Sequence, residues 1–331
     1  MQKDSEINRI AIVGTGVIGA SWAACFLAHG LDVIATDPAP GAEAALHKYV
    51  ESAWPALTKL GLVAGASTSR LTFTTDLKRA LKDADLVQEN GPERDAFKIK
   101  LFADMDASAS PETILASSSS GLTMSRIQTE CVHPERTVIG HPFTPPHLIP
   151  LVEVVGGAKT SPDTIQRALA FYKRMGRHPI HIRKEVKGHV GNRLQAALYR
   201  EIVYLIEQGV VSVADADAAV HLGPGLRWGL MGPNLLFNLG GGAGGMNHFF
   251  EQFTGPMTAW WADLGHPDLS NPQLQERIKK GVLEEVAGRS FEEIAGQRDK
   301  LLMGLLQLLA DDGADSGPKA EGSAAREPRH E

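Results

Sequence analysis

The stretch that decides the fold is Arg9-Ile-Ala-Ile-Val-Gly-Thr-Gly-Val-Ile-Gly19. Its apolar, β-branched start predicts a buried strand, and the glycines that follow have the spacing GxGxxG before an apolar helical run. The first glycine permits a tight turn, the second leaves room for a pyrophosphate, and the third lets the helix pack close to the strand. The free amides at the start of the helix attract phosphate. We therefore expect five residues to contact a dinucleotide: Gly14, Gly16, Val17, Ile18 and Gly19.

Asp37 follows the second predicted strand, 23 residues after Gly14. A carboxylate at this position accepts hydrogen bonds from the ribose hydroxyls and repels a 2′-phosphate, so the sequence predicts NAD rather than NADP. The alternative is a glycine turn that binds no ligand. The coincidence of strand, helix and acid favours the cofactor site.

Short apolar runs alternate with helical runs through the first half of the chain. The expected strands are Arg9–Val13, Leu31–Thr36, Leu71–Thr74, Asp85–Val87, Thr113–Ala116, Thr137–Ile139, Leu151–Val155 and Pro179–Ile182. This alternation predicts an α/β Rossmann-type domain with a mainly parallel sheet over residues 1–187. Residues 188–310 show only helical spacing, beginning with Asn192–Gly209, and predict an all-helical domain for substrate binding and dimerisation. Residues 311–331 have the composition of a disordered tail.

Composition excludes several classes of protein. The chain has 331 residues, a net charge of −6 and two distant cysteines, with no metal-ligand spacing. It has no basic stripe for nucleic acid, no long apolar span and no signal-peptide layout. We expect a cytoplasmic protein that binds no metal, nucleic acid or membrane.

Four further motifs carry a family resemblance. They are Ala116-Ser-Ser-Ser-Ser-Gly-Leu122, Gly140-His-Pro-Phe-Thr-Pro145, Leu151-Val-Glu-Val-Val155 and Lys184-Glu-Val-Lys-Gly-His-Val-Gly-Asn-Arg-Leu194. The chain resembles the 3-hydroxyacyl-CoA dehydrogenase superfamily in these motifs. The resemblance implies a catalytic pair, His141 and Glu153, with Ser120 and Asn192 beside it. It also implies that Glu93 and Lys98 lie near the nicotinamide half of the cofactor, and that Ser118 stands where the family has a cofactor-contacting asparagine.

These residue types suit the oxidation of an alcohol. A histidine accepts and returns the hydroxyl proton near neutral pH, and a carboxylate beside it fixes the tautomer and stabilises the imidazolium. Ser120 and Asn192 can hydrogen-bond the substrate oxygen. Each residue also has a structural interpretation. His141 could be a structural histidine and Glu153 a buried ion-pair partner. Ser120 could belong to a polar turn at a strand end, and Asn192 could cap a helix. Two departures from the family pattern, Thr144 for asparagine and Gly121 for serine, concern the substrate pocket.

The second half carries Gly223-Pro-Gly-Leu-Arg-Trp228. This motif resembles the branch of the superfamily that contains L-carnitine dehydrogenase and L-gulonate 3-dehydrogenase, which act on free 3-hydroxy acids. We therefore expect Arg227 and Trp228 to bind substrate, the guanidinium taking a free carboxylate; an ordinary salt bridge is the alternative. The aromatic residues around Trp228, Phe249 and Trp260 suit either a trimethylammonium group or a core or dimer interface.

Three functions remain open. The first is NAD-dependent oxidation of a small free L-3-hydroxy acid, by a homodimer. The second is a short-chain L-3-hydroxyacyl-CoA dehydrogenase, for which Lys173-Arg-Met-Gly-Arg-His178 offers a basic area for CoA phosphates. The third is a non-catalytic NAD-binding protein on a retained scaffold, which the presence of all four catalytic residues disfavours.

Overall fold

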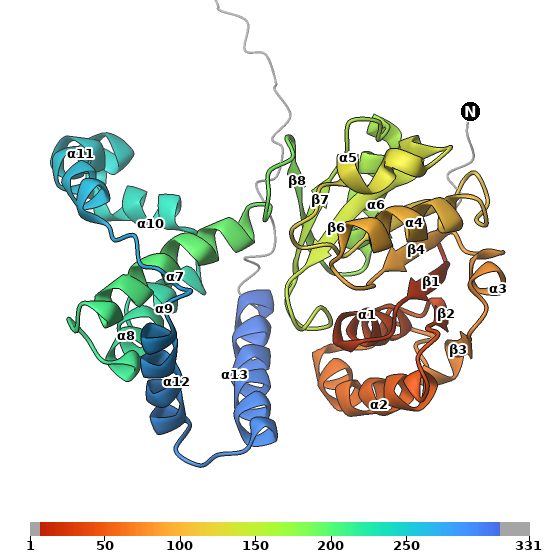
Figure 1. Cartoon of the computed structure of the whole chain (residues 1–331), viewed down its shortest axis with the longest axis horizontal. Coiled ribbons are helices and arrows are strands. Elements are labelled where there is room, and N and C mark those ends of the chain that lie inside the picture. The colour runs from red at the N-terminus through yellow and green to blue at the C-terminus, as the bar shows by residue number, and fades with distance from the viewer. Residues whose placement is uncertain (1–6, 312–331) are drawn as a thin grey trace, which may run out of the picture. The chain divides into compact units, whose positions relative to one another are not determined.

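The computed structural model describes residues 7–311 (Figure 1). Its backbone contacts divide the chain into two units, Met1–Leu198 and Tyr199–Glu331, and each unit is considered by itself. The tail expected at residues 311–331 lies outside the described residues, apart from Asp311 at the end of the last helix.

Within residues 7–198, eight strands form one sheet: β1 (Arg9–Val13), β2 (Asp32–Thr36), β3 (Leu71–Thr74), β4 (Leu86–Glu89), β5 (Ile114–Ser117), β6 (Thr137–Pro142), β7 (Leu151–Val155) and β8 (His178–Ile182). Their order is β3-β2-β1-β4-β5-β6-β7-β8. Every neighbouring pair is parallel except β6 and β7. The Rossmann-type, mainly parallel sheet is therefore confirmed.

The central strands are buried on both faces, which explains their continuous apolar sequence. In β1, Ile10 and Ile12 join one hydrophobic cluster with α1 (Val17–Ala28), α2 (Ala42–Leu60) and α6 (Pro162–Arg174). Ala11 and Val13 join the other cluster, with α3 (Leu77–Leu81), α4 (Asp95–Asp106) and α5 (Met124–Ile127). Successive side chains of a strand point to opposite faces, so this alternation produces three layers.

The order of the strands reverses between β1 and β4. In such a sheet the loops after the two strands separate and leave a crevice at the carboxyl ends, where ligands bind. The glycine loop follows β1, Asn90 follows β4 and Ser118 follows β5. The topology therefore gathers the expected cofactor residues at one edge.

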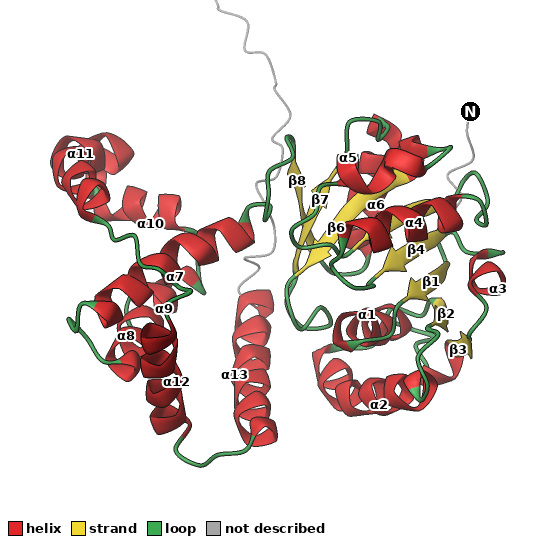
Figure 2. Cartoon of the chain, viewed as in Figure 1, coloured by secondary structure: helices red, strands yellow, loops and turns green. Residues whose placement is uncertain are grey.

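The second unit contains only helices within residues 199–311, as Figure 2 shows, which confirms the all-helical prediction. Helix α7 (Gly191–Glu207) begins in the first unit and continues into the second. It is followed by α8 (Val213–His221), α9 (Pro224–Trp228), α10 (Pro233–Gly240), α11 (Gly245–Asp263), α12 (Pro272–Val286) and α13 (Phe291–Asp311). A small core joins Ile206, Val213 and Ala216.

Short 3₁₀ turns occur in both units, at Thr68–Arg70, Gln128–Glu130, Pro134–Arg136 and Gly242–Gly244. None of the helices within residues 7–311 combines the length and the apolar character of a membrane span.

Candidate active site

The three glycines of the loop after β1 have different local surroundings. Gly14 has φ +87°, and a Cβ there would lie 3.0 Å from the carbonyl of Asn90. A Cβ on Gly19 would lie 2.0 Å from the carbonyl oxygen of Gly14, whereas one on Gly16 would meet nothing within 4 Å. The chain itself thus requires Gly14 and Gly19. The open space at Gly16, just before α1 begins at Val17, leaves room for a pyrophosphate.

Asp37 is tied to the same loop. Its Oδ2 accepts hydrogen bonds from the backbone N–H of Thr15 at 2.8 Å and from the Thr15 hydroxyl at 3.2 Å. Its Oδ1 accepts one from the N–H of Ala39 at 2.9 Å. A carboxylate has about four lone-pair sites and three are occupied here, so acceptor capacity remains for a ribose hydroxyl, on Oδ1.

His141 and Glu153 are direct cross-strand partners. They occupy opposite positions of the antiparallel β6–β7 pair, and His141 Nδ1 lies 2.7 Å from Glu153 Oε2. Both side chains are buried, at 7% and 0% exposure. Because Nδ1–H donates to the carboxylate, the lone pair of the imidazole is on Nε2. The twelve-residue spacing thus follows from the register of two adjacent strands.

The other oxygen of Glu153 binds the start of α7. Oε1 accepts hydrogen bonds from the backbone N–H groups of Val190 and Gly191, each at 2.9 Å. Burial alone would raise the pKa of Glu153, but the hydrogen bonds from His141, Gly191 and Val190 together lower it below its usual value. The group is therefore a carboxylate at neutral pH, able to stabilise a protonated His141.

Ser120 and Asn192 lie together beside the histidine. The side-chain amide of Asn192 donates to the carbonyl of Ser120 at 3.2 Å, which joins the end of β5 to the first turn of α7. Both residues and His141 line a pocket of about 550 Å³. Also lining it are Ile18, Glu93, Lys98, Ser118 and Thr144. Glu153 lies behind His141, in the sheet.

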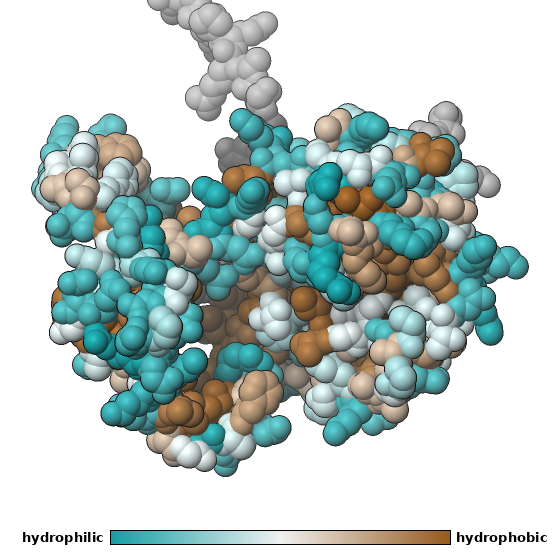
Figure 3. Space-filling model, in the orientation of Figure 1, coloured by the Kyte–Doolittle hydropathy of each residue, from teal (hydrophilic) through white to brown (hydrophobic). Residues whose placement is uncertain are grey.

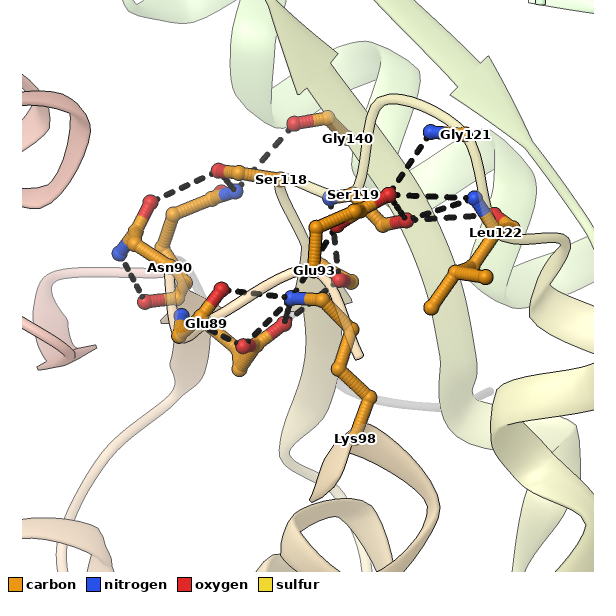
Figure 4. Close-up of polar contacts among 12 residues, drawn as sticks. Glu89, Asn90, Glu93, Lys98, Ser118, Ser119, Gly121, Leu122 and Gly140 are labelled. Carbon is orange, nitrogen blue, oxygen red and sulfur yellow. Dashed lines mark hydrogen bonds and ion pairs between the residues drawn. The ribbon is translucent and has the colours of Figure 1, made fainter. Parts of the chain in front are cut away.

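Lys98 makes a buried ion pair beneath this pocket. Its Nζ lies 2.8 Å from both carboxylate oxygens of Glu89 and 3.1 Å from the carbonyl of Gly91. Only 1% of the lysine side chain is exposed. Figure 4 shows the ammonium between the carboxylates of Glu89 and Glu93. The geometry supports a role for Lys98 in holding the loop after β4.

Glu93 holds the turn that follows Ser120. Its Oε1 accepts from the Ser119 hydroxyl at 2.6 Å and from the N–H of Gly121 at 2.8 Å. Burial would raise the pKa of Glu93, yet these bonds and the charge of Lys98, 3.8 Å from Oε2, lower it. Figure 4 shows the same carboxylate directed at Leu122. A Cβ on Gly121 would lie 3.5 Å from Glu93 Oε1, an ordinary van der Waals contact, so a Cβ fits at this position.

Ser118 belongs to a buried polar network. Its hydroxyl donates to Asn90 Oδ1 at 2.7 Å and accepts from Gln88 Nε2 at 2.8 Å and from the indole of Trp22 at 3.3 Å. Gln88 in turn accepts from the hydroxyl of Tyr172 at 2.6 Å. The Ser118 hydroxyl therefore already has protein partners, although the residue also lines the pocket.

Arg227 and Trp228 lie in α9 of the second unit. Both are exposed there, Trp228 at 40%. In the aromatic region, Phe249 stacks on Phe237 with ring centroids 4.6 Å apart, while Trp260 is 57% exposed. The structure brings Ser120, His141, Glu153 and Asn192 together within the first unit; the substrate role of Arg227 and Trp228 stays a prediction.

Gln195 and His189 are among the residues near the site that the sequence did not predict as site residues. Gln195 lines the pocket three residues after Asn192, and helical spacing from Asn192 would have indicated it. His189 packs against His141, with ring centroids 5.3 Å apart. It lies within the motif at residues 184–194, but its neighbours come from distant segments, so residue spacing alone did not indicate its position beside His141.

Comparison with known proteins identifies the relatives of this chain. Residues 9–186 match the family model of the 3-hydroxyacyl-CoA dehydrogenase NAD-binding domain, and residues 188–291 match that of the C-terminal domain. An L-carnitine dehydrogenase of Bacillus cereus is 47% identical over 92% of this chain and 93% of its own length. One from Streptomyces griseus is 46% identical over 91% and 90%.

The similar solved structures include 5-formyl-3-hydroxy-2-methylpyridine 4-carboxylic acid 5-dehydrogenase, an NAD⁺-dependent dismutase. It has a TM-score of 0.79 and 31% identity, over 92% of this chain and 99% of that chain. The 3-hydroxybutyryl-CoA dehydrogenase of Escherichia coli has a TM-score of 0.64 and 28% identity, over 83% of this chain and 57% of that one. The chain therefore belongs to the 3-hydroxyacyl-CoA dehydrogenase family and is an NAD-dependent dehydrogenase.

Proposed function

We propose that the chain oxidises a small free L-3-hydroxy acid to the 3-keto acid, with L-carnitine as the leading substrate. The contact between His141 and Glu153, at a pocket beside the glycine loop, carries the proposal of alcohol oxidation. The relatives named L-carnitine dehydrogenase, at 41–47% identity over most of their length, support the choice of substrate. L-Gulonate is the second substrate to be tested.

The residues divide the chemistry as follows. NAD, when bound, supplies the acceptor for the hydride from C3. His141 Nε2 takes the hydroxyl proton, and the carboxylate of Glu153 stabilises the imidazolium that results. Ser120 and Asn192 hydrogen-bond the reacting oxygen or the neighbouring carboxylate, because both line the pocket with His141. Asp37 binds the adenosine ribose.

The contacts of the basic residues at 173–178 favour a free acid over a CoA ester as the substrate. Arg174 donates to the carbonyl of Ile7, and Arg177 donates to the carbonyl of Pro146 at 3.0 Å. Both guanidinium groups thus already have main-chain partners and are poorly placed to receive CoA phosphates. Arg227, exposed in the second unit, is the proposed ligand of a free carboxylate, with Trp228 beside it.

We also propose a cytoplasmic homodimer. The second unit exposes large apolar side chains, among them Leu283 at 70% and Phe291 at 79%, and Figure 3 shows hydrophobic surface near the turn between α12 and α13. Exposed apolar area of this kind is typical of an interface between subunits. Cys25 and Cys131 are both buried and unpaired, which suits a reducing compartment.

The experiment is a substrate panel followed by NADH absorbance at 340 nm. L-Carnitine, D-carnitine, L-gulonate, L-3-hydroxybutyrate and L-3-hydroxybutyryl-CoA are compared by kcat/KM. We expect the highest value for L-carnitine and none for D-carnitine. Turnover confined to the CoA ester would contradict the free-acid proposal, and NAD binding without turnover of any substrate would support the non-catalytic alternative.

A further inference from the structure

His189 lies in an unusual backbone conformation at the start of α7. Its φ is +50°, and the preceding Gly188 has φ +75°. A left-handed conformation is unfavourable for a residue with a side chain, so other contacts must hold His189 there. The residues that follow at once are Val190 and Gly191, whose amides bind Glu153. The turn at His189 therefore directs both amides toward the catalytic carboxylate.

The side chain of His189 supplies the contacts that hold the turn. It is 1% exposed, and its Nε2 lies 3.0 Å from the carbonyl oxygen of Ser119. A carbonyl only accepts, so Nε2 carries the hydrogen and Nδ1 has the lone pair. Nδ1 is buried without a hydrogen-bond partner among residues 7–311. Burial disfavours the charged ring and lowers the pKa of His189, and the nearby His141 acts in the same direction.

His189 thus contacts the segments that carry Ser120, His141 and Glu153. Its imidazole is hydrogen-bonded to Ser119, which precedes Ser120, and its ring centroid lies 5.3 Å from that of His141 at an interplanar angle of 45°. Its backbone carries the turn that places the amides on Glu153. A neutral ring in contact with His141 adds no competing charge when that residue becomes protonated.

We propose that His189 is a positioning residue for the His141–Glu153 pair. The bond from its Nε2 to Ser119 holds the turn at residues 188–191 so that both amides stay on Glu153, and its ring fixes one side of His141. The inference rests on the proposed function, in which His141 is the general base. Residues that hold a catalytic group in place in this way typically contribute about 10- to 100-fold to activity.

The test compares His189→Phe, which keeps a ring but has no donor, with His189→Gln, whose amide nitrogen reaches about as far as Nε2. Thr113→Val is the matched control, because it also removes one bond from a buried side chain to a main-chain carbonyl, that of Ala84 at 2.7 Å, away from the pocket. Each full-length variant is measured for kcat and KM with L-carnitine, for NAD affinity by calorimetry and for Tm.

We expect kcat of His189→Phe to fall about 10- to 100-fold with KM and NAD affinity changed less than threefold. His189→Gln should recover most of kcat, and Thr113→Val should lower Tm without lowering kcat. A kcat of His189→Phe within twofold of the wild type, or equal losses in His189→Phe and His189→Gln, would overturn the inference. His141→Gln separates the two proposals: if it keeps its activity the proposed function fails, whereas loss in His141→Gln alone refutes only the role of His189.

Discussion

Replacing Glu153 by glutamine tests the pair by changing a charge and little else. Glutamine has nearly the same shape, and its side-chain oxygen can still accept from the amides of Val190 and Gly191 at about the present 2.9 Å. Its NH₂ group then faces His141 Nδ1, where a carboxylate oxygen now lies at 2.7 Å. The NH₂ group and the Nδ1–H group are both donors and cannot hydrogen-bond each other. The imidazole must therefore change tautomer and place its hydrogen on Nε2.

This tautomer has no lone pair on Nε2 to accept the substrate proton. The variant also loses the negative charge that stabilises the imidazolium. In the serine proteases, the analogous change from aspartate to asparagine lowers kcat about 10⁴-fold. We expect a loss of about 10³- to 10⁴-fold in Glu153→Gln, which corresponds to about 4–5 kcal/mol of transition-state stabilisation.

The assay measures initial rates of NADH formation from L-carnitine at pH values from about 6 to about 10, a range centred on mildly basic conditions. NAD affinity by calorimetry is the control, because Glu153 lies behind His141 and away from the glycine loop. The affinity should change less than threefold. A kcat for Glu153→Gln within tenfold of the wild type would refute the tautomer reasoning.

Three further changes have defined outcomes. Asp37→Ala should weaken NAD binding about 10- to 100-fold, since it removes charge-assisted hydrogen bonds, and should relax discrimination against NADP; calorimetry with both dinucleotides measures this. Gly19→Ala should lower the free energy of unfolding by about 1–3 kcal/mol in urea titrations, because its Cβ would lie 2.0 Å from the carbonyl oxygen of Gly14. The folded chain should also become less stable as the pH falls. The pKa values of Glu153 and Glu93 are lowered in the folded chain, so their stabilisation is complete above the unfolded value near 4.5 and is lost as pH falls through the folded values. Thermal unfolding is measured at pH values from about 7 to about 3, the range that spans carboxylate titration. The loss of Tm as the pH falls should be smaller in Glu153→Gln than in the wild type.

The strands could be predicted because each has a local signature. A strand that is buried on both faces has a continuous apolar sequence, and all eight expected strands occur, three of them with unchanged bounds, Arg9–Val13, Leu71–Thr74 and Leu151–Val155. The glycine loop and Asp37 follow two of these strands directly. Their position at the edge of the sheet therefore follows from the fold class alone.

The helical unit was harder to predict in detail. Helix α11 spans Gly245–Asp263 and has Pro256 in its interior, a residue that normally ends or kinks a helix. Its side chains are almost all exposed, so no clear apolar stripe marks a buried face. The sequence showed that the region has no strand but did not delimit α10 and α11.

The proposed catalytic pair illustrates what a motif shows and what it omits. The resemblance indicated His141 and Glu153, and the antiparallel register explains why they are twelve residues apart. The amides of Val190 and Gly191 and the ring of His189 complete the site from a segment more than thirty residues further on. Their role depends on a left-handed turn and on long-range packing, neither of which leaves a periodic pattern in the sequence.

The most direct test of the central claim is the turnover of L-carnitine by His141→Gln, measured beside NAD affinity on the same preparation. Glutamine keeps a polar side chain but cannot accept and return a proton near neutral pH. We expect a kcat lower by about 10³-fold or more, with NAD bound as tightly as by the wild type. A kcat close to that of the wild type, with NAD still bound, would show that another group accepts the proton.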